Sequence, residues 1–244
     1  MNQSRPTGPA ALRESISLWV ICLGGIALFK FVLARVIPPA GALTGAVAVA
    51  AFLYGPEFYF RRRGEVHADY GLSLARWPRD LAHALIVMAI IFPLFAVAFS
   101  AFAWSLPRLP PTLAALLAPY GTPHAFSLRL PEKFLELCAG NAAVAVAEEF
   151  FYRGYMQTLL ERGWPPGARA VRFLGVPMGR AFFVTAALFA VGHLLEPAPW
   201  RLGVFFPALL FGWIRGRTGT VAGAALVHGT SNVFLAFLEA SFYG

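Results

Sequence analysis

Charged residues are scarce in this sequence. Asp, Glu, Lys and Arg make up 13% of its 244 residues, whereas hydrophobic residues make up 58%. A soluble domain carries roughly 25% charged residues. The composition therefore argues against an ordinary soluble domain. It predicts an all-α, polytopic transmembrane helix bundle.

Acidic residues and cysteines are also few. The 12 acidic residues face 20 basic ones, which gives a net charge of +8. Such an excess can indicate a nucleic-acid partner, but nearly all of it lies in blocks between apolar segments, as the positive-inside rule describes. We therefore predict contact with membrane lipids and no nucleic acid. Cys22 and Cys138 lie inside apolar runs, and we interpret them as unpaired core thiols.

Apolar runs predict about seven membrane spans, at 16–37, 41–60, 81–104, 133–160, 181–195, 201–215 and 219–240. Residues 1–15 are predicted to form a short cytoplasmic tail, 16–132 the N-terminal transmembrane helices with their amphipathic loops, and 133–244 a helical core. The basic segment 61–80 is expected at the lipid headgroups. Residues 105–132 contain TLAALLAP, which is too short to cross a bilayer and predicts a short interfacial helix.

Alternating the spans from a cytoplasmic N-terminus gives a strong charge asymmetry. The inner segments would hold Arg5, Arg13, Arg61, Arg62, Arg63, Arg76, Arg79, Arg162, Arg169, Arg172, Arg180, Arg215 and Arg217. The outer segments would hold only Arg35, Arg108, Arg129, Lys133 and Arg201. The sequence thus predicts an outside C-terminus. Its richness in Arg, Ala, Gly and Pro is typical of a bacterial protein, so we expect a bacterial inner membrane.

The stretch 141–155, NAAVAVAEEFFYRGY, places ionisable groups inside an apolar segment. A charge at membrane depth costs at least ~2.5–3.5 kcal/mol, so each group needs a partner or a chemical role. Glu149 and Arg153 are four residues apart on one helical face and are predicted to form an ion pair. Glu148 points about 100° away from that face. We therefore expect Glu148 to be available as a base.

Two later spans carry further polar groups on single helical faces, Phe189 with His193 in LFAVGHLLEP and His228 with Asn232 in LVHGTSN. A lone buried histidine is usually a satisfied core residue, but this combination favours a site. Counted at ~1.5 Å per residue, Glu148, His193 and Asn232 lie roughly 20 Å deep and His228 roughly 14 Å. A central polar cavity could therefore hold them together.

Such a cavity would suit hydrolysis. A buried glutamate beside a histidine can take a proton from water, while a second histidine and an amide can donate to an oxyanion. The sequence has no G-x-S-x-G motif for a serine nucleophile. Two histidines and a glutamate can also bind catalytic zinc, but H-E-x-x-H is absent. A zinc-dependent enzyme is therefore the less favoured alternative.

Three motifs occur in order: EEFFYR, FAVGH and HGTSN. They resemble the E-E-x-x-x-R, F-x-x-x-H and H-x-x-x-N patterns of the CPBP intramembrane protease family, which includes the type II CAAX prenyl endopeptidases and bacterial Abi-type proteins. The resemblance extends from Glu148 to Asn232, roughly the C-terminal third. It implies about eight spans and a glutamic-type peptidase with no metal or other cofactor. It further implies that Glu148 with His193 activates the water, and that His228 and Asn232 stabilise the oxyanion.

The same resemblance implies that Glu149 and Arg153 hold the helix in place and that Phe189 packs beside the site. The expected substrate is a membrane-anchored protein or peptide cut near a membrane segment. Some bacterial members resemble proteases that process C-terminal anchor (sorting) signals of exported proteins, and others are linked to bacteriocin maturation or self-immunity. The alternative from another class is a non-catalytic membrane immunity or transport-partner protein, in which the polar cluster only ties helices together.

Overall fold

The computed structural model of the protein describes residues 5–167 and 170–244. Two sets of predicted features lie outside these ranges. The first four residues of the predicted tail and Arg169, which was assigned to an inner segment, lie outside the described residues.

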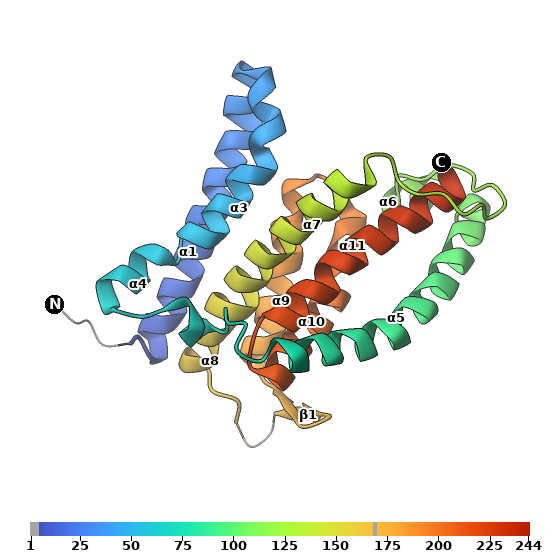
Figure 1. Ribbon diagram of the computed structural model, residues 1–244. Coiled ribbons are helices and arrows are strands. Elements are labelled where there is room, and N and C mark those ends of the chain that lie inside the picture. The colour runs from blue at the N-terminus through green and yellow to red at the C-terminus, as the bar shows by residue number, and fades with distance from the viewer. Residues whose placement is uncertain (1–4, 168–169) are drawn as a thin grey trace.

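The first half of the chain is helical, with short π and 3₁₀ segments labelled η (Figure 1). Its elements are α1 (Gly8–Leu28), η1 (Phe29–Leu33), α2 (Ala34–Val36), η2 (Pro38–Leu43), α3 (Thr44–Tyr54), α4 (Glu57–Arg63), η3 (His67–Tyr70), α5 (Trp77–Ser105), η4 (Leu106–Arg108) and α6 (Pro111–Leu117). Helix α6 is the short helix predicted within 105–132. Helix α5 remains continuous through Pro93.

The second half contains the predicted polar motifs. Its elements are α7 (Phe134–Glu149), η5 (Phe150–Met156), α8 (Gln157–Gly163), β1 (Val171–Phe173), β2 (Val176–Met178), α9 (Arg180–Gly192), η6 (His193–Leu195), η7 (Pro199–Val204), α10 (Phe205–Thr218) and α11 (Ala222–Tyr243). The antiparallel hairpin β1–β2 lies between the predicted spans 133–160 and 181–195. Leu174 and Gly175 both have positive φ, 46° and 85°, which suits a tight hairpin turn.

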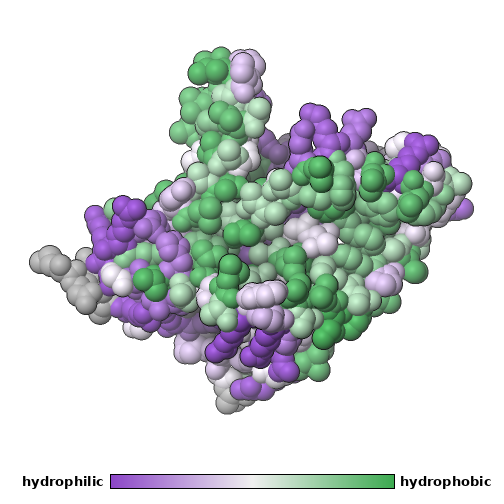
Figure 2. Space-filling model, viewed as in Figure 1, coloured by the Kyte–Doolittle hydropathy of each residue, from purple (hydrophilic) through white to green (hydrophobic). Residues whose placement is uncertain are grey.

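Three helices in the described ranges are long and apolar enough to cross a membrane: Gly8–Val36, Pro38–Arg63 and Trp77–Arg108. The later predicted spans coincide with helices that are shorter, such as Arg180–Leu195, or that contain the polar motifs. Those polar side chains lower the hydropathy of their helices. Figure 2 shows hydrophobic residues over most of the visible helical surface, with hydrophilic residues gathered toward its ends.

Helices α7 and α11 run side by side in the centre, with α5 along α11 and with α9 and α10 behind them (Figure 1). A Cβ added at Gly229 would lie 3.4 Å from the Cβ of Ala145, so these two helices approach closely. The hairpin of α1 and α3 projects from this body and packs against η5 through aromatic residues, among them Phe52 and Phe151 at a ring distance of 4.7 Å. The fold thus surrounds the motif stretch with helices.

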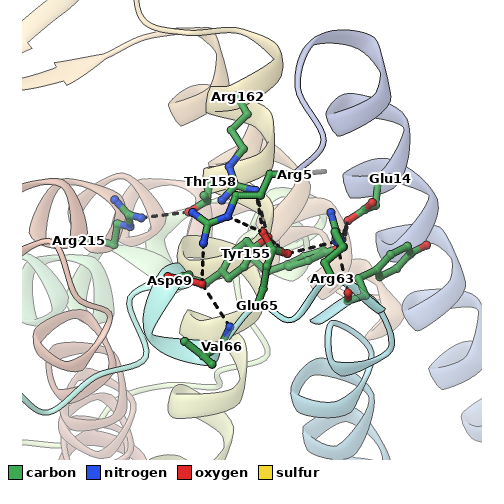
Figure 3. Close-up of polar contacts among 12 residues, drawn as sticks. Arg5, Glu14, Arg63, Glu65, Val66, Asp69, Tyr155, Thr158, Arg162 and Arg215 are labelled. Atoms are coloured by element: carbon green, nitrogen blue, oxygen red, sulfur yellow. Dashed lines mark hydrogen bonds and ion pairs between the residues drawn. The ribbon is translucent and has the colours of Figure 1, made fainter. Parts of the chain in front are cut away.

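An ionic network joins the start of the chain to the segment after α4 (Figure 3). Arg63 pairs with Glu14 at 2.5 Å and with Glu65 at 3.2 Å, and Arg5 pairs with Glu65 at 3.2 Å. Tyr155 donates to Glu14 at 2.7 Å. These contacts explain why α1 begins at Gly8, inside the segment predicted to be a tail, because its polar residues have partners in the body.

Candidate active site

The two motif glutamates lie at the end of α7, where the helix changes to the π-helical segment η5 (Phe150–Met156). Every residue of η5 is buried. π-Helical turns are rare and occur frequently at functional sites. The change of helical period therefore falls directly after Glu148 and Glu149, in a stretch whose position is fixed by packing on all sides.

The ion pair expected between Glu149 and Arg153 is present. Arg153 Nη1 donates to Glu149 Oε1 at 3.0 Å, and both side chains are almost completely buried. Arg153 Nη2 donates to the carbonyl of Ala208 in α10 at 3.2 Å. Its guanidinium lies 4.2 Å from the ring centre of Phe189 in α9. Arg153 thus ties the motif stretch to two other helices.

Glu149 has a second partner that was not predicted. Its Oε1 also accepts a hydrogen bond from His228 Nδ1 at 2.9 Å. Because the proton on Nδ1 is directed at Glu149, the other ring nitrogen is turned toward the remaining space of the site. The His228 ring stacks on Phe211 at 4.7 Å between ring centres, which also fixes its plane.

Glu148 lies on the other side of this histidine. Its Oε2 is 3.7 Å from His228 Nε2. Its side chain is 16% exposed, whereas that of Glu149 is 0% exposed. Among the described residues, no side chain or backbone group forms a hydrogen bond with the Glu148 carboxylate. The two adjacent carboxylates therefore differ sharply, since one is locked in an ion pair and the other can be reached by solvent.

His193 lies at the end of α9, where the helix tightens into η6. Its Nδ1 donates to the carbonyl of Phe189 at 2.9 Å, and the two rings pack with centres 4.5 Å apart. This hydrogen bond leaves Nε2 as the acceptor of the neutral ring. The Phe189 ring that His193 packs on also lies 5.8 Å from the ring centre of His228. The backbone of α9 thus sets the tautomer that proton acceptance needs.

The remaining predicted residues occupy the same part of the bundle. Phe189 is buried, and its ring centre lies 5.8 Å from that of His228 and 5.0 Å from that of Tyr152. Asn232 is half-buried, one turn after His228 in α11. In the described part of the chain, no hydrogen bond involves its amide. Its NH₂ group is therefore available for a ligand.

Sequence reasoning missed two contributors, Phe211 and the backbone carbonyl of Ala208, both from α10. No spacing links them to the polar motifs, so only the packing of α10 against η5 reveals them. For the described residues, no cluster of three or more His, Cys, Asp and Glu side chains has an arrangement that could hold a metal ion.

The fold and the site define a class: an all-α protein with helices of membrane-spanning length and a buried cluster of carboxylates and imidazoles. Residues 131–234 match the family model described as type II CAAX prenyl endopeptidase Rce1-like, so this part of the chain is similar to the domain of that family. The resemblance stated from the three motifs is thereby confirmed. Comparisons with curated proteins and with solved structures gave no match.

Proposed function

We propose that the protein is a glutamic-type intramembrane endopeptidase that hydrolyses a peptide bond near a membrane segment. The Rce1-like domain and the apolar helices support this assignment. The observation that carries it is the contrast between the adjacent glutamates. Glu149 is fully buried and bonded to Arg153 and His228, whereas the Glu148 side chain is partly exposed beside the His228 imidazole.

In the proposed reaction, Glu148 accepts a proton from the attacking water as the water oxygen bonds to the scissile carbonyl carbon. His193 assists through its unprotonated Nε2, because Nδ1 is held by the Phe189 carbonyl. The proton is then delivered to the amine nitrogen as the C–N bond breaks. General acid–base catalysis of this kind contributes typically ~10²–10⁴-fold.

His228 and Asn232 stabilise the oxyanion in this proposal. The Asn232 amide donates one hydrogen bond. His228 donates a hydrogen bond to the oxyanion from Nε2 while Nδ1 continues to donate to Glu149. This arrangement uses the protonated imidazolium, because only in that form are both ring nitrogens donors. Glu149 and Arg153 therefore position His228 in addition to holding the helix, and Phe189 packs between them and His193.

The proposed substrate is a membrane-anchored protein or peptide, including exported proteins with a C-terminal anchor (sorting) signal. We place the reaction in a bacterial inner membrane, with a cytoplasmic N-terminus and an outside C-terminus, and without a metal or other cofactor. A chelator tests the zinc alternative directly. Prolonged chelation should leave cleavage unchanged, whereas loss followed by recovery with zinc would identify a metalloprotease.

A reconstituted cleavage assay with Glu148→Gln tests the function. The substrate would be a co-expressed anchor-signal protein, and mass spectrometry of the product termini would identify the cut bond. We expect a loss of ~10²-fold or more, because the amide cannot accept the proton. Glu132→Gln, an exposed position within the same domain, serves as the matched control. Cleavage at the wild-type rate by the Glu148 variant would remove this residue as the base.

A non-catalytic immunity or transport-partner protein is the competing function. It is favoured by one observation, namely that Arg153 and His228 tie α10 and α11 to η5 and α7 whether or not a reaction occurs. The two functions differ in one measurable outcome. Wild-type protein that produces no defined product termini from any anchor-signal substrate, while keeping its fold, would support the non-catalytic role.

A further inference from the structure

An apolar groove lies between α7 and α11, with a volume of about 770 Å³. This volume is within the range of small-molecule sites. The groove is lined by one face of α7 that includes Ala142 and Val146, by one face of α11 that includes Leu226 and Gly229, and by the loop Leu72–Leu74. Val146 and Leu226 on its two sides are 41% and 40% exposed. The groove thus opens on the outside of the helical body.

This groove is separate from the candidate active site. Gly229 forms part of its wall, and the preceding residue, His228, projects about 100° away around α11. Because Gly229 packs against Ala145 and Ala142 of α7, the contact between these helices separates the groove from the polar cluster. A ligand in the groove would lie on one side of the contact between α7 and α11, and the proposed substrate peptide would lie on the other side.

The length of the groove matches one leaflet of a bilayer. Along α7 its wall extends from Phe134 to Val146, a distance of about 18 Å at ~1.5 Å per residue. The hydrocarbon core of a bilayer is about 30 Å thick, so one leaflet contributes about 15 Å. A single acyl chain running along the helices would therefore fill the groove from end to end.

One end of the groove is polar and basic. The loop Leu72–Leu74 closes it there, and Ser73 adds a hydroxyl group. Arg76, Trp77 and Arg79 follow within six residues and are exposed. Among the described residues, neither arginine forms an ion pair with a carboxylate. Figure 2 shows hydrophilic residues below the apolar face of α7 and α11, where this loop leads into α5.

The nearest acidic residue in the sequence does not cancel this charge. Asp80 is buried and accepts a hydrogen bond from Thr220 at 2.7 Å. The exposed part of the segment therefore presents positive charge, a hydroxyl and an interfacial tryptophan beside an acyl-sized channel. Basic residues next to a membrane attract anionic headgroups, and tryptophan is enriched at that depth.

From this juxtaposition we infer that the α7–α11 groove binds one anionic phospholipid. One of its acyl chains lies along Ala142, Val146 and Leu226, and its phosphate lies at Arg76 with Ser73. The occupant is a bilayer lipid, held more tightly than the lipids that cover the remaining apolar surface.

Native mass spectrometry of the full-length protein tests this inference, with phosphatidylglycerol and phosphatidylcholine of identical chains titrated separately. We expect one phosphatidylglycerol to remain bound at collision energies that remove phosphatidylcholine. Ala142→Phe should abolish this retention by filling the groove. Ala143→Phe, at the adjacent exposed position that does not line the groove, should keep it. Circular dichroism establishes that both variants are folded.

The headgroup is tested with arginine variants. Arg76→Gln should weaken phosphatidylglycerol binding about fivefold, the effect typical of one basic residue near an anionic headgroup, and leave phosphatidylcholine binding unchanged. Arg62→Gln, an exposed arginine away from the groove lining, is the control. Equal retention of both lipids, or Ala142→Phe behaving like Ala143→Phe, would overturn the inference. Dimer masses lost only in Ala142→Phe would also overturn it, because the groove would then hold a second copy.

Discussion

Glu149 and His228, which are 79 positions apart in the sequence, are joined by a 2.9 Å hydrogen bond from His228 Nδ1 to Glu149 Oε1. The same oxygen accepts from Arg153 Nη1 at 3.0 Å. A single buried carboxylate oxygen therefore fixes both the guanidinium that links three helices and the imidazole proposed to contact the oxyanion. The neighbouring Glu148 takes part in neither bond, so two adjacent residues of one type have different physical roles.

Glu149→Gln should destabilise the fold far more than Glu148→Gln. Removing the Glu149 charge leaves Arg153 buried without its counter-ion, and breaking a buried pair in this way costs about 3–5 kcal/mol. Glu148 is partly exposed, and its ion-pair partner nearest among residues 5–167 and 170–244 is His228, at 3.7 Å. Thermal unfolding of both variants in the same detergent measures the difference. Equal unfolding temperatures would show that Glu149 has no greater structural role than its neighbour.

His193→Ala should reduce cleavage by ~10²–10⁴-fold while leaving the unfolding temperature close to that of the wild type. The reason is that, within the described residues, the ring forms a single hydrogen bond, and this bond is local, from Nδ1 to the Phe189 carbonyl one turn earlier. Cleavage rates and thermal unfolding would be measured on the same preparation. A folded variant with undiminished cleavage would remove His193 from the reaction.

Asn232→Ala should lower kcat by ~10²–10³-fold with little change in KM, the effect of removing one oxyanion donor. Ser231→Ala is the matched control, because the Ser231 hydroxyl donates within its own helix to the Val227 carbonyl at 2.7 Å. Measuring kcat and KM of both variants in proteoliposomes tests whether Asn232 acts as an oxyanion donor. A rise in KM at unchanged kcat would instead assign Asn232 to substrate binding.

The sequence predicted the partners that lie on one helix. The four-residue spacing of Glu149 and Arg153 is short enough for helical geometry to imply their ion pair, and the structure contains it. The bond from His228 to Glu149 could not be predicted in this way, because it depends on α11 packing beside α7. Helical periodicity identifies the face on which a residue lies, but it does not specify the helix that this face contacts.

The same limit explains the differences in the fold. Residues 8–15 are polar enough to resemble a tail, yet Glu14 is held by Arg63 and Tyr155 from distant segments. The β1–β2 hairpin was missed because its strands are only three residues long. A run of three residues is too short to show the alternation that indicates a strand. Polar residues in α7 and α11 mark the proposed site and also weaken the hydropathy signal of these helices.

Tyr70 gives a prediction for alkaline pH. Burial raises the pKa of Tyr70 to about 12, and the hydrogen bond that its hydroxyl donates to Glu65 acts in the same direction, while Arg162 opposes both. An unfolded tyrosine has a pKa of about 10. Because the folded pKa is the higher one, the folded state retains the proton over this interval. The stabilisation of the folded state by this proton is therefore complete below about pH 10 and is lost as the pH rises toward 12.

Tyr70→Phe has no proton to lose, so its unfolding temperature should fall less than that of the wild type between pH 9 and about pH 12. Parallel pH dependences in the two proteins would show that Tyr70 does not titrate in this interval.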